Sequence, residues 1–307
     1  MTGATELGFN AVMFPRRPSY AAAVSVVALT VAVGLSGPIV AATAGSLPVV
    51  LAGAGDIARA GSPSVPQTQT ANVLTDLDPD AVFAAGDLQY ETGALADFMA
   101  SYDPTWGVHK AITVPAIGNH EWKTPGASGW KNYWDLNRTW DAYDVGTWRV
   151  YVLDTNCTKV GGCNNTSPQF QWLKAQLESD TATCIAAVWH HPLFTSGNHH
   201  GPSNKVRPLW RLLDRNDGDV VLVGHAHQYE RFGLQDGFGA SDPAGMREFV
   251  VGTGGDGLQG FASTTMPNSQ FRLKAHGVLE LTLGITGYSW RFLDTERATR
   301  DSGSANC

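Results

Sequence analysis

The chain contains little cysteine, and none of it stands in a Cys-x-x-Cys arrangement. Four cysteines occur among 307 residues. Because thiolate zinc sites are built from closely spaced cysteine pairs, the sequence argues against a cysteine zinc site. An even number of cysteines in an exported chain favours two disulfides, for which three pairings are possible. The pairing that we favour joins Cys157 to Cys163 around a short glycine loop, and Cys184 to Cys307 in the C-terminal tail.

Positive charge is also scarce. The 21 Lys and Arg residues are outnumbered by 28 Asp and Glu residues, which gives a formal net charge of −7. Nucleic-acid binding depends on Lys and Arg that contact phosphates, so nucleic acid is not expected as a partner. A small phosphorylated substrate stays compatible with this balance, because bound metal ions would supply positive charge locally.

Charged residues are absent from Ala21 to Ala44, shortly after Arg16 and Arg17. A basic pair, an apolar run and small residues at its end are typical of a cleaved secretory signal. An uncleaved signal anchor is the alternative, because the run is long enough to span a bilayer. The sequence therefore predicts a leader over residues 1–44 and a single domain over residues 45–307. The protein is expected to be secreted or extracytoplasmic, with membrane attachment through residues 21–44 only if the leader stays uncleaved.

Short apolar runs recur along the rest of the chain and alternate with helical patterns. Ser167-Pro168 followed by apolar residues at helical spacing predicts one helix, and a stripe from Val206 to Leu213 predicts another. Strand, helix and strand in succession imply parallel pairing and the α/β class. The runs that we expect to be buried strands are Leu47–Ala54, Ala81–Ala85, Ala111–Ile117, Trp148–Leu153, Ile185–Trp189 and Val220–Val223.

Helical periodicity fades after Met246. The runs Glu248–Val251, Gly277–Leu283 and Tyr288–Leu293 predict a terminal group of antiparallel strands. The glycine-rich segment Gly252–Gly257 is interpreted as a tight turn rather than a phosphate cradle, because no Gly-Lys-Ser/Thr follows it.

Seven of the nine histidines fall into four short clusters, and polar side chains stand where the apolar runs end. Ligands bind beyond the carboxyl ends of the strands in open α/β sheets, so these side chains are expected to converge. Carboxylate, amide oxygen and imidazole without thiolate suit Fe, Mn or Zn. They outnumber what one ion needs, which predicts two metal ions. The residues at the strand ends are Asp56, Asp87, Asn119, His190 and His225.

The order and spacing of these motifs resemble those of the calcineurin-like metallophosphoesterases, over Leu47 to about Leu293. The resemblance implies a four-layer α/β/β/α metallophosphoesterase sandwich with mixed sheets, in which residues 45–307 form one catalytic domain. It also implies a metal-dependent phosphoric ester hydrolase. The matching motifs are Asp56, Gly86-Asp87-Leu88-Gln89-Tyr90, Gly118-Asn119-His120-Glu121, His190 with Pro192, and Gly224-His225-Ala226-His227.

Tyr90 is similar to the tyrosine ligand of purple acid phosphatases, and His199-His200 resemble the pair beside the substrate phosphate in plant-type members. One departure is Ala58, where purple acid phosphatases usually carry Gly and many superfamily members carry His. Loss of the His fits a tyrosine-ligated first site, whereas Ala for Gly leaves the subfamily open. The resemblance implies a first ion, Fe(III), held by Asp56, Asp87, Tyr90 and His227, and a second, divalent Fe, Zn or Mn, held by Asp87, Asn119, His190 and His225.

The chemistry expected at such a site is hydrolysis. Two cations lower the pKa of a bound water toward about 7 and neutralise phosphate oxygens, which predicts in-line attack of hydroxide at phosphorus. His120, beside Asn119, is the first candidate to protonate the leaving group. His199 and His200 are alternatives for that role, or donors that bind the phosphate. His191 would at most orient a metal ligand.

Three functions follow as hypotheses. The first is a secreted phosphomonoesterase similar to purple acid phosphatases, acting on a small phosphorylated substrate. The second keeps the fold and the metals (Mn, Zn or Fe) but hydrolyses a phosphodiester, and the motifs do not separate the two. The third is a secreted metal-binding protein without turnover. The intact His120 argues against the third, because binding alone needs no proton donor.

Overall fold

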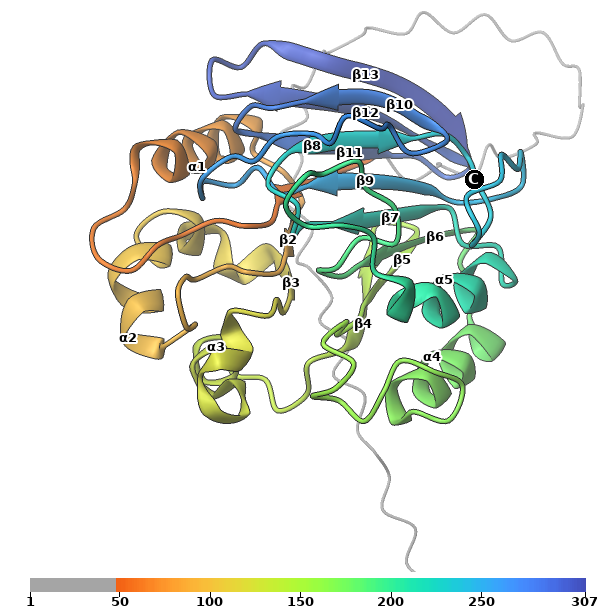
Figure 1. Cartoon of the computed structure of the whole chain (residues 1–307), viewed down its shortest axis with the longest axis horizontal. Coiled ribbons are helices and arrows are strands. Elements are labelled where there is room, and N and C mark those ends of the chain that lie inside the picture. Colours follow the sequence, from red (N-terminus) through yellow and green to blue (C-terminus); the bar gives the residue numbers. More distant parts are fainter. Residues whose placement is uncertain (1–47) are drawn as a thin grey trace, which may run out of the picture.

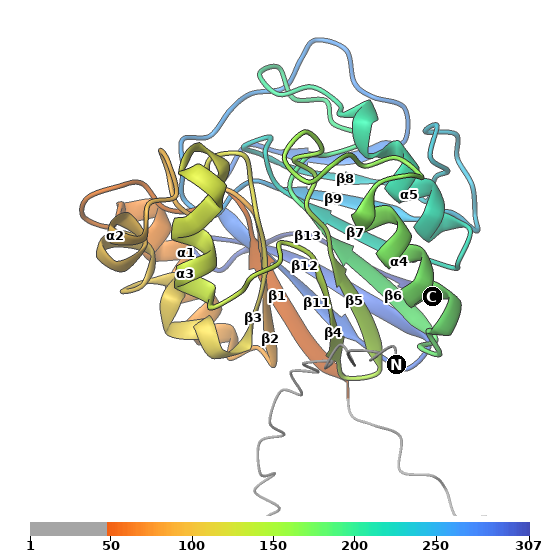
Figure 2. The same ribbon diagram turned by 90° about the horizontal axis from the view of Figure 1, so that it is seen from below.

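The computed structural model describes residues 48–307, so the leader expected at residues 1–44 lies outside the described residues. Two β-sheets pack face to face, and helices cover their outer faces, as Figure 1 and Figure 2 show. This order of layers confirms the α/β/β/α sandwich with mixed sheets. Between residues 48 and 307, every helix is too short or too polar to cross a bilayer.

The first sheet has six strands in the order β13-β12-β11-β1-β2-β3. Strands β1, β2 and β3 run parallel, whereas β11, β12 and β13 are antiparallel to their neighbours. Its strands are β1 (Val49–Ala54), β2 (Ala81–Ala85), β3 (Thr113–Ala116), β11 (Gly277–Leu283), β12 (Gly287–Asp294) and β13 (Thr299–Asn306).

The second sheet has seven strands in the order β10-β8-β9-β7-β6-β5-β4. Strands β5, β6, β7 and β9 are parallel, with antiparallel strands on both flanks. Its strands are β4 (Asp141–Val145), β5 (Trp148–Val152), β6 (Cys184–Val188), β7 (Val220–Val223), β8 (Tyr229–Phe232), β9 (Arg247–Val251) and β10 (Ser269–Leu273).

One prediction for the C-terminal region is wrong. Strand β9 was expected in an antiparallel group, but it pairs parallel with β7 and antiparallel with β8. The chain leaves β7, forms β8 beyond β9, and then returns through a long loop to run in the direction of β7. A short apolar run predicts a buried strand but not whether that strand runs parallel or antiparallel to its neighbours, so the sequence did not distinguish the two pairings.

The longer helices begin where their capping residues predict. Helix α1 (Val65–Leu77) starts after Ser64, which forms a capping box with Gln67. Helix α4 (Pro168–Ser179) starts after Ser167, whose side chain accepts the Phe170 amide. The other α-helices of residues 48–307 are α2 (Leu95–Asp97), α3 (Ser128–Trp134) and α5 (Arg207–Asp214).

Apolar contacts hold the layers together. Between the sheets, Tyr229 of β8 stacks on Phe292 of β12 with ring centroids 4.1 Å apart. On the outer face of the second sheet, Leu173 of α4 and Trp210 of α5 are buried in one cluster with Trp189. Both expected disulfides are present, Cys157–Cys163 and Cys184–Cys307. The second joins β6 to the end of the chain, so the last strand is tied covalently to the opposite sheet.

Asp219, just before β7, is expected to make stability depend on pH. Its carboxylate accepts the Ile185 amide at 2.8 Å, but burial raises the pKa of Asp219 to about 6. Between the ordinary pKa of an aspartate and pH 6, the Asp219 carboxyl keeps its proton in the folded state but has released it in the unfolded state. The free energy of unfolding therefore falls as pH rises through this range. Asp219→Asn should remove this loss, gaining about 1 kcal/mol over wild type between pH 4 and pH 7 after allowance for partial exposure. Urea unfolding at both pH values measures the gain, and an equal difference at both would contradict it.

Candidate metal centre

The carboxyl ends of strands from both sheets meet at one edge and bring the predicted residues together. Asp56 and Asp87 follow β1 and β2, Asn119 follows β3, and His190 and His225 follow β6 and β7. Three of these residues leave their strands with a positive φ, at 58° for Asp56, 49° for Asp87 and 68° for His225. This backbone conformation is uncommon outside glycine, and such outliers often mark functional sites.

The first group of donor atoms comes from Asp56, Tyr90 and His227. The Tyr90 hydroxyl donates to Asp56 Oδ1 at 2.7 Å and lies 3.1 Å from His227 Nε2. His227 Nε2 is 3.2 Å from Asp56 Oδ1. The other ring nitrogen, Nδ1, lies 2.8 Å from the Gly257 carbonyl oxygen, to which it can only donate. Nε2 is therefore the nitrogen left for a metal ion. We call these three residues the first half of the site.

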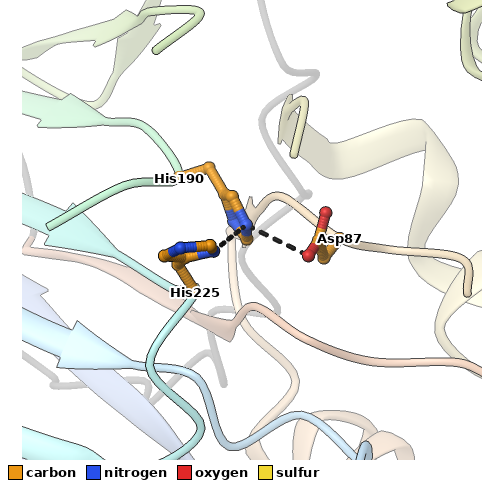
Figure 3. Close-up of side chains that lie close together, drawn as sticks. All are labelled: Asp87, His190 and His225. Carbon is orange, nitrogen blue, oxygen red and sulfur yellow. Dashed lines mark hydrogen bonds and ion pairs between the residues drawn. The ribbon is translucent and has the colours of Figure 1, made fainter. Parts of the chain in front are cut away.

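The second group comes from Asp87, Asn119, His190 and His225, which we call the second half. Figure 3 shows His190 between Asp87 and His225. His190 Nε2 lies 3.1 Å from Asp87 Oδ2, 3.2 Å from Asn119 Oδ1 and 3.1 Å from His225 Nδ1. His190 Nδ1 donates to the Ala85 carbonyl at 2.9 Å, which again turns Nε2 toward the shared centre. Asp87, His190 and His225 each offer an atom within 4.8 Å of the others.

Two glycines let these residues approach. A Cβ at Gly118 would lie 2.1 Å from Asp87 Oδ1 and 2.2 Å from the Asp87 amide nitrogen. A Cβ at Gly86, where φ is +82°, would lie 2.6 Å from His190 Nδ1. Both distances are far below van der Waals contact, so only glycine fits beneath the site.

The electrostatics of the two halves favour cations. Burial opposes ionisation of Asp87, but the adjacent His190 holds the pKa of Asp87 well below its usual range. Despite burial, Asp87 raises the pKa of His190 to about 9, and Asp56 raises that of His227 to about 9. Each carboxylate thus attracts a positive charge to the Nε2 position that a metal ion would take. Burial and then the charges of Asp56 and Asp87 raise the pKa of Tyr90 well above its ordinary value, so a phenolate there requires a cation.

A polar pocket of about 310 Å³ opens over both halves. His120 lines it beside the first half, with its ring 4.2 Å from that of Tyr90. His200 lines it beside both halves, with its ring 4.1 Å from that of His225 and 5.9 Å from that of His227. His199 is next to His200 but more exposed. The structure therefore brings all three predicted catalytic histidines to the pocket.

His191 lies outside the pocket lining but touches the site from behind. Its Nδ1 lies 2.9 Å from Thr155 Oγ1, and its ring centroid is 4.4 Å from that of His225. Burial, and then the neighbouring His190, lower the pKa of His191 to about 3, so this ring is neutral. A neutral ring packed on His225 fits the orienting role that the sequence allowed.

The pocket wall also contains residues that the sequence did not single out: Arg59, Glu91, Asp256 and Gln259. Asp256 belongs to the glycine-rich turn after β9, which is a turn as expected but lies against the first half. Arg59 and Glu91 follow Asp56 and Tyr90 by a few residues, and that proximity was the one available signal.

Comparison with known proteins agrees with this geometry. The model of a family described as calcineurin-like phosphoesterase matches residues 54–229. Purple acid phosphatase 18 of Arabidopsis thaliana is 25% identical over 278 residues, covering 82% of this chain and 62% of the plant protein. The Fe(3+)-Zn(2+) purple acid phosphatase 12 of the same plant is 27% identical over 257 residues, covering 68% and 53%.

Among solved structures, a purple acid phosphatase from yellow lupin (Lupinus luteus) seeds superposes with a TM-score of 0.70 at 19% identity. The match covers 85% of this chain and 54% of the lupin chain. At that identity the likeness concerns the fold. The chain spans about half to three fifths of the length of these relatives.

Proposed function

Because the chain belongs to the calcineurin-like phosphoesterase family, we propose that it is a metal-dependent hydrolase of phosphate monoesters, of the purple acid phosphatase type. The observation that carries the proposal is the convergence of Tyr90 Oη with Asp56 Oδ1 and His227 Nε2, at 2.7 and 3.1 Å. A buried phenol beside a carboxylate and an imidazole is a donor set for a hard trivalent ion. The printed names of the plant relatives, purple acid phosphatases, point the same way.

The donor sets fit two ions. The first half would hold Fe(III), and the second half a divalent Fe, Zn or Mn, with Asp87 shared between them. The charge of Asp87 acts on both Tyr90 and His190, which supports a shared role for this carboxylate. When bound, the two ions would supply Lewis-acid activation of water and neutralisation of the phosphate oxygens.

The protein's own groups around the ions have distinct tasks. His120 lines the pocket, its Nδ1 lies 2.8 Å from the Glu91 carbonyl oxygen, and its Nε2 lies 4.0 Å from Asp87 Oδ2. From there His120 would deliver a proton to the leaving alkoxide. His199 and His200 also line the pocket and would donate hydrogen bonds to the phosphate oxygens.

A phosphodiesterase on the same site is the second candidate. The pocket is open and its wall is polar, so nothing in its lining requires a small leaving group. Comparing rates on a monoester and a diester that share one leaving group separates the two activities. A protein that binds metal without turnover is disfavoured, because three histidines beyond the predicted ligands face the pocket.

The protein is proposed to act outside the cytoplasm. The two disulfides support an oxidising compartment. The proposed secretion signal at residues 1–44, and the alternative membrane anchor at residues 21–44, lie outside the described residues. The proposed partner is a small phosphorylated substrate rather than nucleic acid, in keeping with the net charge of −7.

The visible spectrum of the aerobically purified protein tests the proposal, together with metal analysis and a Tyr90→Phe variant. Tyrosinate bound to Fe(III) absorbs visible light, so we expect a coloured wild type and a colourless variant. Phe fills the same buried space and removes only the hydroxyl that meets Asp56 and His227. A colourless, active wild type containing Mn or Zn would contradict the ferric site and favour the diesterase candidate.

A further inference from the structure

A buried carboxylate lies behind the first half of the site. The Asp256 side chain is 2% exposed, and its Oδ2 is 3.7 Å from His227 Nδ1. This is the edge of the ring opposite Nε2, so Asp256 is placed behind the predicted ligand and not among the ligands. The Asp256 amide also donates to the Asp56 carbonyl at 2.9 Å, which ties the turn after β9 to the loop after β1.

Arg59 pairs with this carboxylate and also lies over the ring of Tyr90, one of the three residues of the first half. Its Nε pairs with Asp256 Oδ1, and its Nη2 lies 3.2 Å from Asp256 Oδ2. Its Nη1 donates to Glu91 Oε1 at 2.6 Å. The guanidinium carbon is 5.5 Å from the centroid of the Tyr90 ring. Arg59 thus holds its charge between the Asp256 carboxylate and the face of the Tyr90 ring.

We propose that Asp256 and Arg59 are a pair of positioning residues that sets the charge felt by the metal ion in the first half of the site. The inference rests on the proposed function in one respect, namely that an ion binds to Asp56, Tyr90 and His227. Neither residue touches that ion. Asp256 acts through His227, and Arg59 acts through Asp256 and Tyr90.

The physical reason is the sign of the two charges. His227 Nδ1 gives its hydrogen bond to the Gly257 carbonyl, and the Asp256 carboxylate 3.7 Å away adds a negative charge that makes the imidazole a stronger donor and strengthens metal binding. A guanidinium on the same carboxylate cancels part of this effect. Because Asp256 is buried, its charge is poorly screened by solvent. Removing Arg59 leaves the Asp256 carboxylate without its cation, whereas removing Asp256 leaves Arg59 paired only with Glu91. The two removals therefore change the charge near the metal in opposite directions.

Chelator competition tests this on the purified, metal-loaded protein. The ion in the first half is identified as the one whose retention changes in Tyr90→Phe. For that ion we expect Asp256→Asn to weaken binding about 10- to 100-fold. Arg59→Met, which keeps the aliphatic stem without the charge, should tighten binding by up to about tenfold, because the exposed guanidinium is partly screened by solvent. The double variant should return close to wild type, and the ion in the second half should change less in every variant.

Two further variants separate charge from packing. Arg59→Lys keeps the charge and should bind the first ion almost as wild type does. Asp76→Asn removes one carboxylate from the exposed Asp76–Arg297 ion pair, and controls for net charge alone. The visible absorption band of an iron-loaded protein gives an independent reading, because it should shift in opposite directions in Asp256→Asn and Arg59→Met.

The outcomes are distinguishable. Equal weakening of the binding of both ions in Asp256→Asn and Arg59→Met would overturn the proposal, because a loss of packing weakens binding whichever charge is removed. No change in metal binding in either variant would also overturn it. Opposite shifts confined to the first ion would support it. If Tyr90→Phe altered the retention of no ion, the proposed first metal half would itself be wrong, and the role of the pair would fall with it.

Discussion

Replacing Asp87 by asparagine is expected to lower kcat/KM for a phosphate monoester by about 10³-fold or more and to reduce the metal content. The charge stabilisation supplied by bound cations amounts to several kcal/mol, and each 1.36 kcal/mol corresponds to a factor of ten in rate. Asp87 Oδ2 faces His190 Nε2 at 3.1 Å, and its charge also reaches Tyr90. The variant therefore weakens both halves of the site at once.

The asparagine side chain should preserve the local fold. Asp87 Oδ1 accepts the His120 amide at 2.8 Å, and an amide oxygen can accept the same hydrogen bond. The loss should therefore appear in metal content and turnover while the circular dichroism spectrum stays close to that of wild type. Asp76→Asn, at an exposed ion pair, is the matched control and should keep full activity. Wild-type metal content together with full turnover in Asp87→Asn would remove Asp87 from the site.

The site was more predictable from the sequence than the fold around it. Asp56, Asp87, Asn119, His190 and His225 each follow a short buried strand, and parallel strands deliver their carboxyl ends to one edge. The place of each motif residue at a strand end therefore predicts where it lies in the fold. Whether these residues hold two ions remains a prediction, since the structure shows only that their donor atoms converge.

The strands that the sequence missed lie mostly at sheet edges. Strand β13 reads Thr-Arg-Asp-Ser-Gly-Ser-Ala-Asn, and β10 alternates half-buried and exposed residues. An edge strand is stabilised by one neighbour, so its own residues need little hydrophobicity. Strand β8 was missed for a different reason. It is buried but only four residues long, and it includes Glu230, whose carboxylate accepts the Ser196 amide at 2.7 Å.

Arg59 and Asp256 show a second limit. Both are charged residues in turns, where charge is ordinary and predicts nothing. Only the fold reveals that Asp256 is buried and that Arg59 reaches it from another loop, 197 positions away in the sequence. An ion pair between distant loops has no characteristic separation in the sequence, so no local pattern predicts it.

His120→Ala is expected to have an effect that depends on the leaving group. A general acid contributes about 10²- to 10⁴-fold when the leaving oxygen needs a proton. We therefore expect a loss of that size in kcat with an alkyl phosphate, whose alkoxide is strongly basic. With 4-nitrophenyl phosphate the leaving phenolate is stable without protonation, and the loss should be less than about tenfold.

The matched control is His200→Ala, which also lines the pocket, with its ring 4.1 Å from that of His225. A residue that binds the phosphate stabilises the same oxygens whatever group departs, so His200→Ala should slow both substrates by the same factor. Steady-state kinetics with the two substrates on both variants gives four rates. If His120→Ala slowed both substrates equally and His200→Ala slowed them unequally, the two roles would be exchanged. Only the residue that protonates the leaving group has an effect that depends on the leaving group.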